Sequence, residues 1–352
     1  MRVGVELEFW VIDEDGELVS AADLLGIHEA VAPEFVEPML EIQVPPADRI
    51  AELRQNLIAI LETVLARAAD LDKHLVPLGT PLTEHRFPIT SDRGKLLQRI
   101  YGDEIRYAKN CAGTHVHFDK GNVVRQLNLL TALDPAIALV SSSPYYDGVQ
   151  LGMDARAITY RSHSTELLTR YRDLWPYAET ADEWDERLTQ MYETLKLRAE
   201  QLDIPESEFT RCIQREDVVL TPVRLRKQTP TVEWRAPDVA LPSQILQLVS
   251  DVSMLLSLTE DRSVNVGTPG VRPEEIGIPP FTELRAIATT AMNDGLSKRV
   301  CRYLSSMRFE TDQYEPMAAE IIGDYRISTA DARQARLEYA ERLRSDVADL
   351  RY

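Results

Sequence analysis

The chain has 352 residues, and its content of 44% hydrophobic and 27% charged residues is typical of a soluble globular protein. Its formal net charge of −18 should repel nucleic acid. None of its segments has the roughly 18 consecutive apolar residues that span a bilayer. No basic, signal-like segment precedes the first predicted strand. We therefore expect a cytoplasmic protein that binds neither nucleic acid nor membrane.

Alternating and helical patterns of apolar residues predict the elements of the chain in order. They are strands at 3–12 and 37–44, a helix at 48–72, strands at 75–79 and 113–119, helices at 123–133 and 180–202, a hairpin of strands at 218–225 and 231–236, and helices at 243–258 and 329–350. Asp48 is the predicted N-cap of the first helix, and Thr180 with Glu183 forms a predicted capping box.

The character of the sequence changes after Gly267. Thr268-Pro269-Gly270 and Pro279-Pro280 mark loops, and the rest reads as helices. We expect a catalytic part over residues 1–265 and a helical extension over residues 266–352 that packs on it. Segregated strands and helices predict an α+β fold with an antiparallel sheet.

Four predicted strands carry acidic, imidazole or guanidinium side chains on one face. The two-residue period of a strand places Glu6 with Glu8, His115 with His117 and Glu233 with Arg235, while Glu41 lies on a further strand. A single such pair is more often a solvated face. Four strands with the same bias predict a sheet face that binds hard cations and, through them, the phosphates of ATP.

Five segments resemble motifs of the type 2 glutamate–cysteine ligases, a family of carboxylate–amine ligases, and they occur in that family's order. They are Gly4-Val5-Glu6-Leu7-Glu8-Phe9, the acidic segment Glu34–Ile42, Cys111-Ala112-Gly113-Thr114-His115-Val116-His117, the loop Ser142–Gly148 and the strand Thr231–Asp238. The resemblance implies a fold similar to the catalytic domain of glutamine synthetase. In that fold an antiparallel sheet curves into a funnel, and helices pack on its outer face.

The resemblance also implies roles for individual residues. It implies Mg²⁺, with Mn²⁺ as an alternative, held by Glu6, Glu8, Glu41, His115 and Glu233, with Glu34 as a weaker candidate ligand. It implies catalytic roles for Glu233 and Arg235, and contacts to the ATP phosphates from Arg224 and Arg235. The implied substrate-binding residues are Ser143, Tyr145 and either Arg156 or Arg161.

Three departures from the family pattern lie mainly in the substrate half. Leu7 stands where the family carries an acid, Gln43-Val44-Pro45 lacks the usual Thr, and the Gly-rich run before Arg156 is one residue short. The sequence therefore leaves the identity of both substrates open.

The expected activity is an ATP-dependent ligation of a small carboxylic acid to an amine, with glutamate and cysteine as the family default. No GxSxG elbow, Cys–His signature or Walker A loop is present. The substrate carboxylate itself would therefore be activated, as an acyl phosphate, and metals and arginines would hold the nucleotide.

The three cysteines are far apart, and we expect Cys111 to be a small buried thiol. The sequence leaves a homodimer open.

Three alternatives stay open at this point. A phosphotransferase related to the guanidino kinases would release a phosphorylated product instead of an amide. A metal-dependent amidohydrolase could use His115 and His117, but it needs further histidines downstream, and only His163 follows. A noncatalytic binding protein with a retained site is the third.

Overall fold

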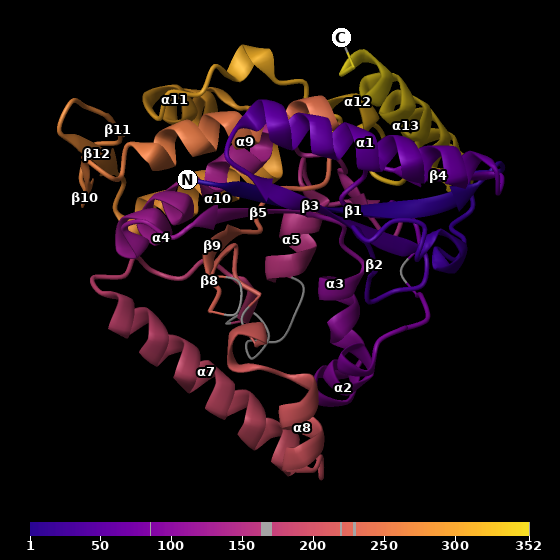
Figure 1. The fold of residues 1–352 in the computed structure, drawn as a ribbon, viewed down its shortest axis with the longest axis horizontal. Coiled ribbons are helices and arrows are strands. Elements are labelled where there is room, and N and C mark those ends of the chain that lie inside the picture. Colours follow the sequence, from indigo (N-terminus) through magenta and orange to yellow (C-terminus); the bar gives the residue numbers. More distant parts are fainter. Residues whose placement is uncertain (85, 163–170, 219, 228–229, 352) are drawn as a thin grey trace.

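The computed structural model describes residues 1–84, 86–162, 171–218, 220–227 and 230–351. Its centre is a seven-stranded antiparallel sheet in the order β2-β3-β1-β5-β9-β8, with β4 paired to β1 (Figure 1). The strands are β1 Val3–Asp13, β2 Val31–Pro33, β3 Met39–Ala47, β4 Lys73–Val76, β5 Thr114–Asp119, β8 Val223–Leu225 and β9 Thr231–Trp234. The long N-terminal strand β1 therefore lies in the middle of the sheet.

One face of the sheet is covered by long helices. They are α1 Ile50–Ala69, α9 Pro242–Ser257 and α13 Thr329–Asp349, and Figure 1 shows α1 and α13 above the sheet. In α1, Leu53, Leu57 and Leu61 are buried at helical spacing, so the helix turns an apolar stripe toward the strands. The sheet meets this stripe with the apolar side chains of β1, among them Leu7 and Phe9, which are fully buried. Burial of these two apolar faces forms the core.

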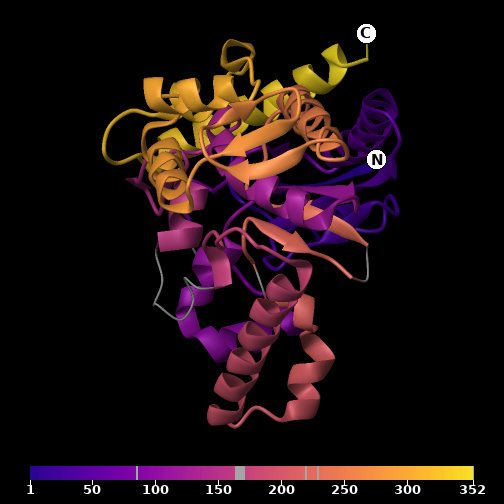
Figure 2. The same ribbon diagram turned by 90° about the vertical axis from the view of Figure 1, so that its left-hand side faces the viewer.

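Five further helices of the described residues lie on the opposite side of the sheet. They are α2 Asp92–Tyr101, α3 Arg106–Lys109, α5 Ala155–Ser162, α7 Ala181–Gln201 and α8 Glu206–Cys212 (Figures 1 and 2). Helices α7 and α8 form an arm that projects away from the sheet, and an ion pair between Arg99 and Glu208 joins the arm to α2. These helices surround the face of the sheet that carries the polar side chains.

The last third of the chain contains a small second sheet that the sequence did not predict. Its strands, in the order β10-β12-β11, are β10 Ser263–Val266, β11 Gly270–Val271 and β12 Glu275–Ile278. The helices α10 Phe281–Asp294, α11 Lys298–Ser306, α12 Ala318–Ile321 and α13 follow. Strands of two to four residues are too short to show a clear alternation, which explains the omission. The division at 265/266 stays a prediction, and β10 spans it.

The predicted fold class is confirmed as α+β, with an antiparallel sheet and helices packed on its outer face. The predicted Thr180 cap is also confirmed, because its hydroxyl accepts from the Glu183 amide at 3.1 Å. The predicted Asp48 cap is wrong. Strand β3 continues through the two prolines to Ala47, which pairs with Val3 after an irregularity in the ladder, and α1 begins only at Ile50.

No helix in the described part of the chain is long and apolar enough to cross a membrane.

Three connecting elements complete the fold. They are α4 Val123–Ala132, the 3-10 helix η3 Asp134–Leu139 and the short hairpin of β6 Tyr145–Tyr146 with β7 Val149–Gln150. The predicted strand pair at 218–225 and 231–236 is present as the shorter β8 and β9. Part of its turn, residues 228–229, lies outside the described residues.

Candidate active site

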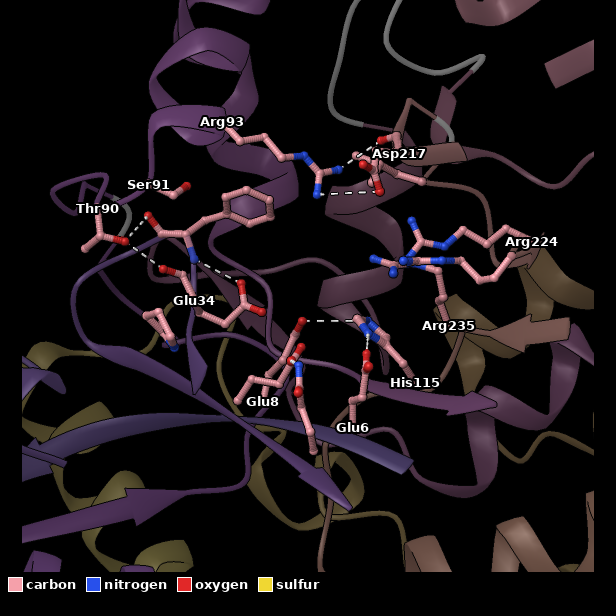
Figure 3. Close-up of a pocket in the computed structure, with 16 residues that line it drawn as sticks. Glu6, Glu8, Glu34, Thr90, Ser91, Arg93, His115, Asp217, Arg224 and Arg235 are labelled. Carbon is pink, nitrogen blue, oxygen red and sulfur yellow. Dashed lines mark hydrogen bonds and ion pairs between the residues drawn. The ribbon is translucent and has the colours of Figure 1, made fainter. Parts of the chain in front are cut away.

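A cavity of about 610 Å³ lies on the polar face of the sheet. Acidic side chains line its floor and arginines line its side, as Figure 3 shows. The residues lining it are Glu6, Glu8, Pro33, Glu34, Phe35, Glu41, Gln43, Thr90, Ser91, Arg93, His115, Asp217, Leu220, Arg224, Arg226 and Arg235. All the predicted metal ligands except Glu233 line this cavity.

The register of the strands brings the predicted residues together. Glu8 of β1 lies opposite Glu41 of β3, and Glu6 lies opposite His115 of β5. Farther along the sheet, Glu233 of β9 lies opposite both His117 and Arg224. Because directly paired residues point to the same face of a sheet, the separate polar faces of these strands form one continuous surface.

Three overlapping groups of side chains could each hold a metal ion. Within each group, one potential ligand atom per residue lies within 4.8 Å of the others. The groups are Glu6, Glu41 and His115; Glu6, His117 and Glu233; and Glu8, Glu34 and Glu41. Carboxylate oxygens with an occasional imidazole suit Mg²⁺ or Mn²⁺. The donor set therefore fits more than one divalent cation.

The carboxyl groups of the third group do not ionise easily without a cation, because they are buried and lie close together. Burial, with the neighbouring Glu41, raises the pKa of Glu8 to about 7. Burial, with Glu8, raises the pKa of Glu34 to about 8. Burial, with Glu34, raises the pKa of Glu41 well above its usual range. A bound cation would remove this repulsion, which is the second observation that fits the site to a metal.

These pKa values predict how stability depends on pH and on metal. An acid whose pKa is raised by folding binds more protons in the folded state, so stability falls as pH rises through the interval between the two pKa values. We expect the metal-free protein to lose stability between about pH 5 and pH 8, with a contribution of roughly 3 kcal/mol from Glu8 alone. Added Mg²⁺ should stabilise the protein more at pH 8 than at pH 5. Thermal melts across this range, with and without Mg²⁺, measure both effects, and a pH-independent response to Mg²⁺ would contradict this reading of the cluster.

Glu233 lies among arginines at the other end of the site. It is fully buried, and Arg224 donates to it twice, at 2.6 and 3.0 Å. Arg235 donates to it at 2.7 Å, and Arg226 approaches to 3.6 Å. Burial alone would raise the pKa of Glu233, but Arg224 and Arg235 hold it well below its usual range. The carboxylate is therefore ionised, and it fixes guanidinium groups beside the metal-ligand groups.

His115 connects the two ends of the site. Its Nδ1 lies 3.3 Å from Glu6 and its Nε2 lies 3.6 Å from Glu8 (Figure 3). Burial and the charge of Arg235 lower the pKa of His115 to about 4. The imidazole is therefore neutral at physiological pH, which is the form that binds a metal.

Three charged residues that line the cavity, Arg93, Asp217 and Arg226, were not predicted from the sequence. Arg93 of α2 donates to the Asp217 carbonyl at 2.9 Å across the upper side of the cavity in Figure 3. Arg226 follows Arg224 by two residues and faces the same cavity. The two-residue period of β8 could have predicted Arg226. No sequence signal connects Arg93 with Asp217.

The predicted substrate-binding residues lie in different surroundings. Ser143 accepts a hydrogen bond from the Thr80 amide, Tyr145 bonds the backbone of Gly323 and Asp324, and Arg161 pairs with Asp134 at 2.7 and 2.8 Å. All three side chains are buried. They line neither the large cavity nor a second, smaller cavity that lies next to it.

Arg156 is placed differently from those three residues. It lines the small cavity of about 40 Å³ next to the large one and donates to the carbonyls of Ala236 and Arg235. Arg156 and Arg161 were the two alternatives for the substrate-binding arginine, and the geometry favours Arg156. His163, which a hydrolase would have needed, lies outside the described residues.

Comparisons with known sequences identify the family. The model of glutamate–cysteine ligase family 2 matches residues 2–241. The chain is 30% identical over 200 residues to a putative glutamate–cysteine ligase 2 of Salinispora tropica, over 53% of this chain and 51% of that protein. It is 25% identical over 356 residues to a putative glutamate–cysteine ligase 2-1 of Streptomyces avermitilis, over 97% of this chain and 90% of that protein. The match thus spans about half the length of the Salinispora relative.

Solved structures agree with this fold. A bifunctional glutathione synthetase from Pasteurella multocida superimposes with a TM-score of 0.61 at 17% identity, covering 98% of this chain and 52% of that one. A glutamate–cysteine ligase from Francisella tularensis, solved with AMP, gives 0.50 at 13% identity, covering 99% and 91%. Both show likeness of fold, and the family model covers more than half of the chain. The chain therefore belongs to glutamate–cysteine ligase family 2.

Proposed function

We propose that this protein is an ATP-dependent carboxylate–amine ligase that forms an amide, with glutamate as its acid substrate. One observation carries the proposal. The large cavity is lined on one side by two of the three groups of potential metal ligands, and the third group shares Glu6 with it. Four arginines, Arg93, Arg224, Arg226 and Arg235, line its other side. Anionic phosphates held between cations and guanidinium groups suit this arrangement.

Some residues of the chain would hold the cations, and others would contact the phosphates. Glu6, Glu8, Glu34, Glu41, His115 and Glu233 would hold the divalent cations, which neutralise phosphate charge when they are bound. Arg235 and Arg224 are already held in place by Glu233, so they can contact the phosphates without losing much further conformational freedom. Arg226 shares their face of the sheet and adds a further positive charge.

The proposed reaction has two steps. In the first, an oxygen of the substrate carboxylate attacks the γ-phosphorus of ATP, the bond from the γ-phosphorus to the bridging oxygen breaks, and ADP leaves. In the second, the amine nitrogen attacks the carbonyl carbon of the acyl phosphate, the C–O bond to phosphate breaks, and inorganic phosphate leaves. The nitrogen loses a proton to solvent, and an amide remains.

No cysteine of the site needs to act as a nucleophile. Cys111 is the cysteine beside the small cavity, and it is buried with its thiol on the Tyr107 carbonyl. Burial raises the pKa of this thiol to about 12, so almost no thiolate is present at neutral pH. This supports direct activation of the substrate carboxylate over a covalent acyl-enzyme.

The names of the relatives support glutamate and cysteine as the substrates to test first. A phosphotransferase would give a phosphorylated product instead of amide and inorganic phosphate, so product analysis separates these two reactions. A cytoplasmic location and a homodimer remain part of the proposal.

Binding of Mg-ATP tests the nucleotide half of the proposal. A ligand at one hundred times its dissociation constant stabilises the folded state by about 2.7 kcal/mol. We expect millimolar Mg-ATP to raise the melting temperature by several degrees, and ATP with EDTA to raise it much less, because the acidic floor of the cavity repels uncomplexed phosphates. A melting temperature indifferent to Mg-ATP would contradict the ligase assignment.

A further inference from the structure

A second cavity, of about 260 Å³, lies outside the site described above and shares no lining residue with the large cavity. Its charged wall carries Arg86, Arg106 and Lys109 against a single acid, Asp103. Apolar side chains, among them Phe87, and the amides of Gln98 and Asn110 form the rest of its wall. A cavity with three basic residues and one acidic residue is unusual in a chain with a net charge of −18. Its composition suits an anionic ligand with a small apolar part.

Lys109, at the end of α3, is the most unusual residue of this cavity. Only 3% of it is exposed. Its Nζ donates to the Gly94 carbonyl at 2.6 Å and lies 5.1 Å from the centre of the Phe35 ring. Within the described part of the chain, no carboxylate forms an ion pair with it. Burial and the charge of Arg93 lower its pKa to about 7.

A buried ammonium without an anion is unfavourable unless a ligand supplies the counter-charge. The residues packed around Lys109 nevertheless allow its ammonium group to be buried. A Cβ on Gly94 would lie 2.9 Å from Nζ, so the glycine permits the approach of the lysine. Nearby, the Nε of Arg106 is also buried and has no hydrogen-bond partner. Two cationic groups on one wall of the cavity therefore have unused capacity to bind an anion.

The small cavity lies between this basic pocket and the acidic site. Ile105 and Lys109 line both the basic and the small cavity. Glu8, Glu34 and Arg235 line both the small and the large cavity. A ligand held at Lys109 would therefore lie next to the acidic site. An amino acid whose carboxylate is bound there can direct its amino group toward that site.

We propose that the second cavity binds the carboxylate of the amine substrate, with Lys109 as the residue that selects for it and Arg106 as its partner. This inference rests on the proposed function and narrows it. The amine is an amino acid, and its decarboxylated analogue is a poor ligand. Lys109 acts by pairing with the carboxylate, and the ion pair compensates for the burial of its ammonium.

Calorimetric titration of matched pairs tests this selectivity. The probes are cysteine against cysteamine and alanine against ethylamine, each added to the protein with Mg-ADP present. We expect the wild type to bind the amino acid of each pair roughly 30-fold more tightly or better, the scale of a buried ion pair. In Lys109→Met this preference should disappear, because binding of the amino acid weakens and binding of the plain amine does not change.

Two controls separate this role from a structural one. Lys95→Met removes an exposed lysine of α2 that pairs with Asp92, and it should leave the selectivity intact. The melting temperature of Lys109→Met should not fall, because the substitution removes a buried charge with no partner. If Lys109→Met does not fold, Arg106→Gln takes its place and should reduce the same preference.

The proposal is wrong if the wild type binds both members of each pair equally, or if Lys109→Met keeps the preference. Failure of the proposed function is a different result, because it would show as absent binding of Mg-ADP, or as no release of phosphate from ATP in the presence of bound amino acid. Selective binding without ligation would leave this site in place and overturn the ligase assignment.

Discussion

Replacing Glu233 with Gln is expected to reduce turnover by at least about a thousandfold. Its carboxylate is fully buried, belongs to one of the three metal-ligand groups, and accepts hydrogen bonds from both Arg224 and Arg235. Glutamine keeps the shape but removes the charge. The divalent cation would then lose a ligand, and two guanidinium groups would face each other across a neutral amide. Effects of this size are typical when a preorganised charge is removed from a catalytic site.

The same substitution should also reduce stability, because breaking a buried ion pair costs about 3–5 kcal/mol. Steady-state kinetics therefore has to be combined with a thermal melt, so that turnover is compared among folded molecules. Glu84→Gln is the control, since the partly exposed Glu84 pairs with the buried Arg336 and lines neither the large nor the small cavity. It should lose stability but keep its activity per folded molecule. Ordinary activity in a folded Glu233→Gln protein would remove Glu233 from the site.

The grouping of the acidic residues in the candidate site could be predicted because these residues lie on strands. In a strand, residues two apart share a face, so the pair Glu6 and Glu8 is visible directly in the sequence. Antiparallel pairing then places Glu6 against His115 and Glu8 against Glu41. Glu233 follows from the same rule on β9. Local periodicity and strand register together determine these contacts.

The residues above the sheet could not be predicted in the same way. Arg93 lies on α2 and Asp217 lies in the 3-10 helix η4 (Arg215–Asp217), far apart in the sequence, and only the tertiary fold brings them together. Lys109 is similar, because nothing in its local sequence shows that it is buried against Gly94 and Phe35. Side chains that enter a site from helices and loops depend on how those segments pack, and single-sequence patterns do not record this packing.

The choice between Arg156 and Arg161 shows what geometry adds. Both lie on α5, five residues apart, and a helix turns about 100° per residue, so their side chains point about 140° apart. Arg156 consequently faces the small cavity, whereas Arg161 faces Asp134 of η3. The sequence motif was one residue short and could not decide between them. The helix geometry separates them, and it assigns the cavity to Arg156.

In the proposed reaction the substrate carboxylate is activated by phosphoryl transfer from ATP, and this step can be followed by the transfer of an oxygen isotope. The reaction should be run with Mg-ATP, an amine and glutamate that carries ¹⁸O in its side-chain carboxyl group. Attack of the carboxylate on the γ-phosphorus places one of its oxygens between carbon and phosphorus. When the amine displaces phosphate, that oxygen leaves with the phosphorus.

Mass spectrometry of the released phosphate then gives a clear result. Phosphoryl activation of the carboxylate predicts one ¹⁸O atom in each inorganic phosphate formed by ligation, with ADP as the other nucleotide product. Label in AMP would show adenylation of the carboxylate, which requires attack at the α-phosphorus. Amide formed without ATP, or with unlabelled phosphate, would contradict activation of the carboxylate by phosphoryl transfer.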